Sequence, residues 1–191
     1  MTPTLWIISP CYNEQEVFKS STDILSKKLR EMIVSELVSS TSKIVFVDDG
    51  STDSTWQLIE EAQEKNEHII GIKLSRNFGQ MHALMAGMDY ARDKCDCIIS
   101  IDVDLQDDIE TFPIFIERFN EGYDIVYGAR NDRQGDSWMK RNTAKLFYTL
   151  MRKNGSKIVA NHSEYRLLSN RALRALQEYK ETNFFLREIV S

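Results

Sequence analysis

The sequence predicts an α/β domain built on a mainly parallel β-sheet that is flanked by helices. Short apolar-rich runs alternate along the chain with segments whose apolar residues recur every three or four positions, and this alternation is typical of parallel α/β proteins. The apolar runs are almost unbroken, which indicates strands that helices cover on both faces. A chain of 191 residues is long enough for one domain with a sizeable core.

The predicted strands are rich in Ile, Val, Leu and Phe, and turn-forming residues mark several of their ends. Pro10 closes the first run, the sequence Asp-Asp-Gly-Ser-Thr-Asp from Asp48 follows the second, and Asp102 follows the fourth. The five strands are expected at 5–9, 43–47, 68–74, 97–101 and 124–128.

The segments between these strands have helical spacing. Val17, Ile24 and Leu25 fall on one side of the first segment, and the methionine-rich stripe within 81–88 of the third is typical of core packing. Pro113 is compatible with the fourth helix only in its first turn. The helices are expected at 14–37, 54–65, 79–92 and 109–121.

Composition and charge narrow the class of protein. The three cysteines, Cys11, Cys95 and Cys97, have no disulfide or zinc spacing and indicate thiols in a reducing compartment. Neither a signal peptide nor an apolar run of about 18 residues occurs in the sequence, so we expect a cytoplasmic location. The net charge is −5, yet segment 128–153 has seven Lys/Arg against two Asp, which suggests separate sites for cations and anions.

Acidic residues follow two of the predicted parallel strands. Ligands of open α/β sheets bind at this edge, so the acids after the second and fourth strands are expected to share a cleft. Asp102 and Asp104 are two apart and point the same way in an extended segment. Such carboxylates suit Mg²⁺ or Mn²⁺ together with substrate phosphate. A solvated acidic loop is the alternative interpretation, and neither a P-loop nor a G-x-G-x-x-G motif is present.

Four motifs in order resemble the family-two inverting glycosyltransferases. The resemblance runs from about Leu5 to Arg187, and its closest match is the polyprenyl-phosphate branch, which includes dolichol-phosphate mannosyltransferase and undecaprenyl-phosphate glucosyltransferases. The motifs are Ser9-Pro-Cys-Tyr-Asn-Glu14, Val47-Asp-Asp-Gly-Ser-Thr-Asp53, Ser75-Arg-Asn-Phe-Gly-Gln80 and Asp102-Val-Asp-Leu-Gln-Asp107.

The resemblance implies a GT-A-type, Rossmann-like fold in which a nucleotide-sugar lies across the strand ends. One of two neighbouring acids, Asp48 or Asp49, would contact the base. Asp102 would lie near the ribose or the metal, and Asp104 would hold the metal and count as catalytic. Arg76 and Gln80 would border the donor, with surface polar residues as the alternative interpretation. The base and ribose pocket would be lined by Pro10, Tyr12 and Glu14.

The acceptor side of the resemblance rests on the second half of the chain. His162-Ser-Glu-Tyr-Arg-Leu167 resembles the family's H-S-x-D-Y-R-L type motif, which makes Glu164 the candidate catalytic carboxylate. It departs from that pattern because Glu replaces Asp and one residue is missing. Segment 137–153 mixes basic and aromatic residues and suits a membrane interface, or a helix packed on the core. The candidate ligands of an acceptor phosphate are Arg130, Arg133, Lys140, Arg141 and Arg166.

Together these features predict metal-assisted, inverting transfer of a sugar from a nucleotide-diphosphate sugar to polyprenyl phosphate, at the cytoplasmic face of a membrane. The expected unit is a single catalytic domain, 1–191, cut from a longer protein before C-terminal membrane-associated segments. No nucleic-acid partner is expected, and the sugar, the base and the oligomeric state stay open. Three alternatives remain: transfer to a saccharide hydroxyl, a non-catalytic nucleotide-sugar binding module, and a haloacid-dehalogenase-like phosphohydrolase.

Overall fold

The computed structural model describes residues 2–129 and 162–177. Its six-stranded sheet has the order β3-β2-β1-β4-β6-β5. Strands β1 to β4 pair in parallel, and β6 runs antiparallel to both of its neighbours. The strands are β1 Leu5–Cys11, β2 Lys43–Asp48, β3 Ile69–Lys73, β4 Cys97–Ser100, β5 Ile125–Ala129 and β6 His162–Ser169.

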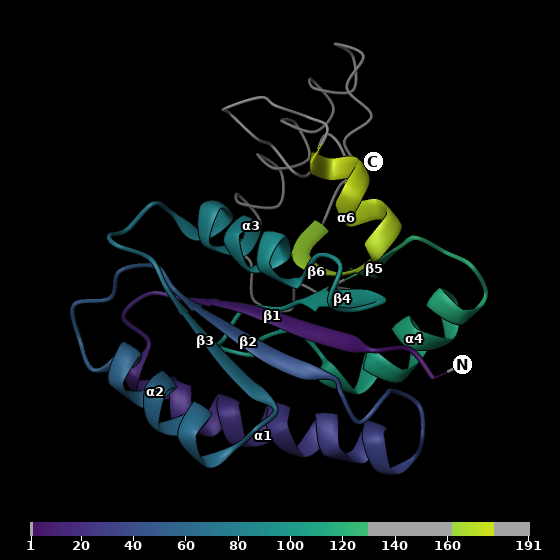
Figure 1. Ribbon diagram of the computed structural model, residues 1–191. Coiled ribbons are helices and arrows are strands. Elements are labelled where there is room, and N and C mark those ends of the chain that lie inside the picture. The colour runs from purple at the N-terminus through teal and green to yellow at the C-terminus, as the bar shows by residue number, and fades with distance from the viewer. Residues whose placement is uncertain (1, 130–161, 178–191) are drawn as a thin grey trace, which may run out of the picture.

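Helices cover both faces of this sheet (Figure 1). Helices α1 and α2 lie on one face, and α3 and α6 lie on the other. The helices are α1 Gln15–Val34, α2 Thr55–Lys65, α3 Gln80–Ala91, α4 Phe112–Asn120 and α6 Asn170–Gln177. The predicted α/β class is confirmed, and the ends of the five predicted strands move by no more than two residues.

One predicted strand end is wrong, because β1 continues through Pro10 to Cys11. The pairing of β1 with β4 stops at Ile8, whereas its pairing with β2 extends to Cys11. The Ile8 carbonyl accepts from the Ile101 amide at 3.0 Å, and the Cys11 carbonyl accepts from the Asp49 amide at 2.8 Å. The backbone nitrogen of Pro10 therefore points toward the β4 side, beyond the last paired residue of that strand. Its missing N–H removes no hydrogen bond from the ladder between β1 and β4.

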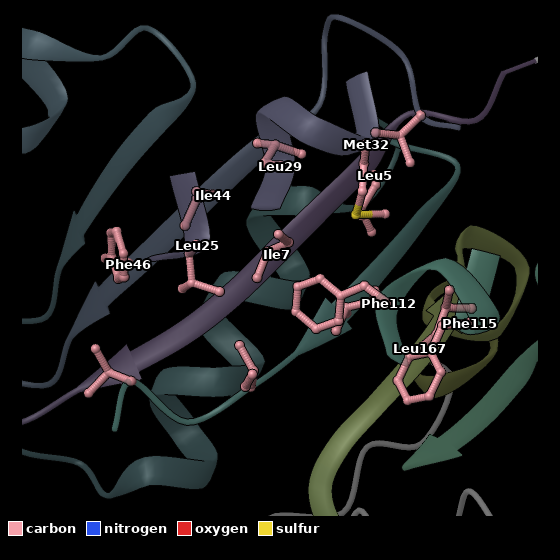
Figure 2. Packing of buried hydrophobic residues seen from close by; sticks show 14 of the residues in the cluster. Leu5, Ile7, Leu25, Leu29, Met32, Ile44, Phe46, Phe112, Phe115 and Leu167 are labelled. Carbon is pink, nitrogen blue, oxygen red and sulfur yellow. The ribbon is translucent and has the colours of Figure 1, made fainter. Parts of the chain in front are cut away.

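The larger apolar core lies between the sheet and helices α1 and α4 (Figure 2). Leu25 and Leu29 of α1 pack toward β1 and β2, where Ile7 and Phe46 are fully buried. Phe112 extends this core beneath β4 and β6. These side chains hold α1 in place, and α1 begins directly after the end of β1.

The second core lies under α3. Leu84 and Met88 are buried there, which confirms the core interpretation of the methionine-rich stripe. Gly87 lets the helix approach the sheet closely, because a Cβ at this position would lie 2.5 Å from Ile8 Cγ2 and 3.0 Å from Val47 Cγ2. The start of α3 is thereby set beside the ends of β1 and β2.

The sequence did not predict β6 as a strand. It lies between β4 and β5, although it comes after both in the chain. Tyr165 faces the larger core and stacks against Phe115 at 4.9 Å between ring centroids. A Cβ at Gly128 would lie 2.1 Å from the Tyr165 ring, so β5 needs glycine there. The predicted helix 109–121 begins as a 3₁₀ turn, Ile109–Thr111, with Pro113 in the first turn of α4.

Within residues 2–129 and 162–177, none of the helices is both long and apolar enough to cross a bilayer.

Candidate active site

A cavity of about 330 Å³ opens at the carboxyl ends of β1, β2 and β4. Its size falls within the range of small-molecule sites. The cavity is lined by Pro10, Cys11, Tyr12, Glu14, Asp49, Asn77, Gly79, Gln80, Asp102, Val103 and Asp104. Seven of the residues singled out in the sequence therefore meet at one place, namely Pro10, Tyr12, Glu14, Asp49, Gln80, Asp102 and Asp104.

One wall of the cavity is made by two loops that hydrogen-bond to each other. The amide of Asn13, a residue with φ 55°, donates to Ser51 Oγ at 2.9 Å, and Asn13 Oδ1 accepts from the Thr52 amide at 2.8 Å. The Glu14 amide donates to Thr55 Oγ1 at 2.8 Å. These bonds fix the start of α1 to the start of α2, and they hold Glu14 half-buried at the cavity.

The cavity has a negative field. The pKa of Glu14 is raised, first by burial and then by the charges of Asp104, Asp53 and Asp102. Like charges close together disfavour ionisation, so the four carboxylates are not independent. A bound cation would relieve this repulsion.

Asp102 and Asp104 extend from the end of β4, with Val103 between them buried to 3% exposure. Both acids line the cavity as predicted, but not because the segment is extended: the chain turns here, the Leu105 amide donates to the Asp102 carbonyl at 3.1 Å, and Val103 lines the cavity as well. Gln80 Nε2 donates to Asp102 Oδ1 at 2.6 Å. Gln106 binds Asp104 with its side-chain Nε2 at 2.7 Å from Oδ2 and its amide at 3.3 Å from Oδ1.

The donor atoms at this edge suit a hard divalent cation. Asp102 and Asp104 offer carboxylate oxygens, whereas the Cys11 thiol is kept protonated because burial, Asp48 and Glu14 raise its pKa well above the usual value. No group of three His, Cys, Asp or Glu with metal-binding geometry occurs in the described part of the chain. A cation held by two carboxylates completes its coordination with phosphate oxygens and water, as Mg²⁺ commonly does.

The structure separates the two acids that follow β2. Asp49 lines the cavity, and its two oxygens accept from the amides of Phe78 and Gly79, each at 2.8 Å. Asp48 is fully buried and does not line the cavity. Arg76 is not among the lining residues, and its guanidinium lies 4.1 Å from the centre of the Phe78 ring. A base contact by Asp49 and a donor contact by Arg76 stay predictions.

The structure describes only some of the residues that were predicted to act on the acceptor. Glu164 lies on the backbone of β6, and Arg166 lies on the same strand, fully buried opposite Ser100 of β4 and Tyr127 of β5. Burial raises the pKa of Tyr127, and the positive charge of nearby Arg166 offsets part of this increase. Outside the described residues are Arg130, Arg133, Lys140, Arg141 and the basic segment 137–153. Their phosphate and membrane roles stay predictions.

Sequence reasoning missed five residues of this site. Cys11, Asn77, Gly79 and Val103 line the cavity, and Gln106 binds Asp104. Each of them lies inside one of the four motifs, so position within a motif was the available signal. The order of the residues within a motif does not show which of them line the cavity.

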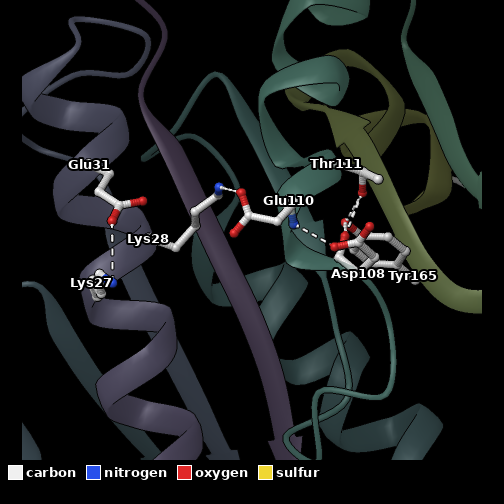
Figure 3. A network of polar contacts seen from close by, with 7 residues as sticks. All are labelled: Lys27, Lys28, Glu31, Asp108, Glu110, Thr111 and Tyr165. Carbon is white, nitrogen blue, oxygen red and sulfur yellow. Dashed lines mark hydrogen bonds and ion pairs between the residues drawn. The ribbon is translucent and has the colours of Figure 1, made fainter.

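Polar contacts anchor the chain just after the acidic loop (Figure 3). Tyr165 of β6 donates its hydroxyl to the Asp108 carbonyl at 2.9 Å and lies 2.5 Å from Thr111 Oγ1. Lys28 of α1, whose side chain is 7% exposed, pairs with Glu110 at 2.5 Å. The loop that begins at Asp102 is thus tied to β6 and to α1 at its far end.

Relatives of this chain carry glycosyltransferase names. It is 46% identical over 188 residues to an uncharacterized glycosyltransferase of Bacillus subtilis, YkoT, covering 98% of this chain and 56% of that protein. It is 38% identical over 186 residues to the prophage bactoprenol glucosyl transferase homolog of Escherichia coli, covering 97% of this chain and 58% of that protein. The chain thus spans little more than half the length of these relatives.

Solved structures share the fold. A mannosyltransferase from Pyrobaculum calidifontis superposes with a TM-score of 0.65 at 17% identity, over 98% of this chain and 50% of that one. Glucosyl-3-phosphoglycerate synthase from Mycobacterium tuberculosis gives 0.54 at 20% identity, over 88% of this chain and 57% of that one. The predicted GT-A-type architecture is thereby confirmed. The family model described as glycosyl transferase family 2 matches residues 6–177, so the chain belongs to glycosyl transferase family 2.

Proposed function

We propose that this domain transfers a sugar, with inversion, from a nucleotide-diphosphate sugar to a polyprenyl phosphate. The observation that carries the proposal is the cavity in which Asp102 and Asp104 meet Tyr12 and Glu14 at the carboxyl edge of the sheet. An acidic pair and an exposed aromatic ring in one cavity offer partners for a cation-bound diphosphate and for a base.

The comparisons support each half of this reaction. The Pyrobaculum calidifontis enzyme was solved with GDP-mannose and Mn²⁺, and the Mycobacterium tuberculosis enzyme with UDP and Mn²⁺. The relatives named bactoprenol glucosyl transferase, from Shigella phages and Escherichia coli, are 37–38% identical to this chain. They favour a polyprenyl-phosphate acceptor, and they make a glucosyl donor the first to test.

Inversion requires one in-line displacement at the anomeric carbon. An oxygen of the acceptor phosphate attacks that carbon, and the bond from the carbon to the nucleoside diphosphate breaks, with the electron pair leaving on the diphosphate. A phosphate monoester has a second pKa of about 6 and is largely dianionic at neutral pH, so no proton has to be removed from it. The residues then have to position both partners.

The donor is held by the wall of the cavity that Tyr12, Glu14 and Asp49 form. Asp102 and Asp104 would hold a Mg²⁺ or Mn²⁺, which would neutralise the charge that develops on the leaving diphosphate. Glu164 would orient the acceptor from β6. The acceptor anion would be bound by Arg130, Arg133, Lys140, Arg141 and Arg166, of which the arginines have bidentate geometry toward phosphate.

The same basic segment, 137–153, is proposed to bring the domain to the cytoplasmic face of a membrane. Its five Lys/Arg would contribute on the order of 1 kcal/mol each near an anionic surface. Replacing Lys140, Arg141, Lys145, Arg152 and Lys153 by Gln should reduce co-sedimentation with phosphatidylglycerol vesicles. Equal sedimentation of the variant and the native chain would contradict this.

The donor site is tested by thermal unfolding with UDP-, GDP-, dTDP- and CMP-sugars, each with and without Mn²⁺. A ligand at 100 times its Kd should add about 2.7 kcal/mol of stability. Asp104→Asn should lose the metal-dependent gain, whereas Asp23→Asn, on the exposed side of α1, should keep it.

The acceptor is tested by transfer from the donor so identified. Product with undecaprenyl phosphate, and none with free saccharides, supports the proposal. Product with saccharides alone would assign a hydroxyl acceptor instead. Donor binding without any transfer would leave a nucleotide-sugar binding module.

A further inference from the structure

Segment 75–79, which joins β3 to α3, lies directly against the loop after β2. Gly50 has φ 69°, and a Cβ there would lie 2.4 Å from the carbonyl carbon of Arg76 and 2.6 Å from the amide nitrogen of Asn77. The two backbones are therefore in contact, and a side chain at position 50 would separate them. The left-handed φ adds a second reason for glycine.

Asp49 fixes the far end of the same segment. Its Oδ1 accepts from the Phe78 amide and its Oδ2 from the Gly79 amide, each at 2.8 Å, and the residue is only 2% exposed. Hydrogen bonds from amides to a carboxylate are stronger than those between neutral groups. The loop after β2 thus sets the backbone immediately before α3.

The next residue is Gln80, the first of α3, and it reaches the acidic pair. Its Nε2 donates to Asp102 Oδ1 at 2.6 Å. The helix behind it cannot slide easily, because Gly87 brings α3 into close contact with Ile8 and Val47 of the sheet. The backbone of Gln80 is consequently fixed at the start of α3, and from there its exposed side chain reaches Asp102.

We propose that Gln80 is the positioning residue of Asp102 and that Asp49 acts on the same carboxylate through segment 75–79. This assignment rests on the proposed function, because it takes Asp102 to be a ligand of the divalent cation. One hydrogen bond fixes the rotation of the carboxylate and thereby selects the oxygen that faces the cation. Partners of this kind change metal affinity by about 10- to 100-fold when they are removed.

The first test is Mn²⁺ binding without nucleotide, followed by the electron paramagnetic resonance signal of free Mn²⁺. Gln80→Met keeps the length of the side chain and removes the donor, and it should weaken Mn²⁺ binding about 10-fold or more. Gln57→Met, on an exposed part of α2, is the matched control and should bind as the native chain does. The unfolding midpoint without metal should change little in Gln80→Met, which shows that the fold is intact.

The second test asks whether Asp49 acts through Gln80. Asp49→Asn replaces an acceptor by an amide, and it should also weaken Mn²⁺ binding. The double variant Asp49→Asn/Gln80→Met should be no weaker than Gln80→Met alone, because coupled residues are not additive. If the two substitutions weakened Mn²⁺ binding independently, so that their fold-losses multiplied, the proposal that Asp49 acts through Gln80 would be overturned.

The outcomes separate this assignment from the proposed function. Native Mn²⁺ affinity in Gln80→Met would overturn the assignment alone, since the native chain still binds the cation. A native chain that takes up no Mn²⁺ would overturn the proposed metal use and the assignment together. Should Asp49→Asn fail to fold, Gln80→Met still decides the role of Gln80.

Discussion

Glu14 is the residue at which the electrostatics of the cavity can be measured directly. Its pKa is raised by burial and by Asp104, Asp53 and Asp102. A carboxyl group whose folded-state pKa is raised favours the folded state at low pH, and that contribution is lost as pH rises through the folded-state pKa. At neutral pH, without a cation, ionised Glu14 therefore destabilises the fold.

Glu14→Gln should accordingly raise the free energy of unfolding at pH 7 without metal, by roughly 0.2–1 kcal/mol for a partly exposed charge. The gain should disappear near pH 3, where both chains are uncharged at this position. Urea unfolding across this pH range measures it. Glu16→Gln, exposed in the first turn of α1, should give no gain, because an acid there is favoured by the helix dipole. A gain that persisted unchanged at pH 3 would rule out the electrostatic explanation.

At the scale of elements, the acidic loop depends on β6. The hydroxyl of Tyr165 donates to the Asp108 carbonyl, which also accepts from Thr111 Oγ1 at 2.7 Å. Tyr165→Phe would leave that carbonyl with two donors, the hydroxyl and the amide of Thr111, so the loss should lie toward the low end of the roughly 0.5–1.5 kcal/mol that a hydrogen bond contributes. Chemical unfolding would measure it, with exposed Tyr123→Phe as the neutral control. A loss as small as that of the control would mean that the bond does not anchor the loop.

Helix α3 depends on its close approach to the sheet. Alanine favours a helix over glycine by about 1 kcal/mol, yet a Cβ at Gly87 would lie 2.5 Å from Ile8 Cγ2. Overpacking of this kind costs about 1–3 kcal/mol, so Gly87→Ala should destabilise the domain in spite of the better propensity. Denaturant unfolding compares it with Asp89→Ala on the exposed side of α3. A more stable Gly87→Ala would show that α3 can move away from the sheet without loss.

The elements that the sequence predicted are those with local signals. β1 to β5 are apolar runs, and the acids at the ends of β2 and β4 had to lie at one edge because these strands are parallel. β6 carries charged residues, Glu164 and Arg166, and it inserts between strands that precede it in the chain. The eight residues of β6 contain no sequence pattern that predicts its burial or its antiparallel pairing.

The same limit applies inside the site. Asp102 and Asp104 were predicted to line the cavity from their place after β4, but the bond from Gln80 to Asp102 joins residues 22 positions apart. The two neighbouring acids Asp48 and Asp49 look equivalent in the sequence. Only the register of β2 decides that one is buried and that the other lines the cavity.

At the scale of the whole molecule, the site belongs to both helical layers. Glu14 precedes α1 on one face of the sheet, whereas Gln80 begins α3 on the other. The two layers share β1, which pairs with both β2 and β4. Neither layer has a sheet of its own, so the domain should unfold as one unit.

Ile7 and Ile8 test this, because they are fully buried neighbours that point into the two different cores. Ile7→Ala and Ile8→Ala should each cost about 2–5 kcal/mol. Trp56 packs against the core of Ile7, and Trp6 belongs to the core of Ile8. In a Trp138→Phe background, two variants that each keep only one of these tryptophans report on one core each, and either alanine substitution should shift the unfolding curves of both variants by the same amount. An alanine substitution that shifts only the curve of its own face would mean that one layer can open while the other stays folded, and that the site can lose one wall without global unfolding.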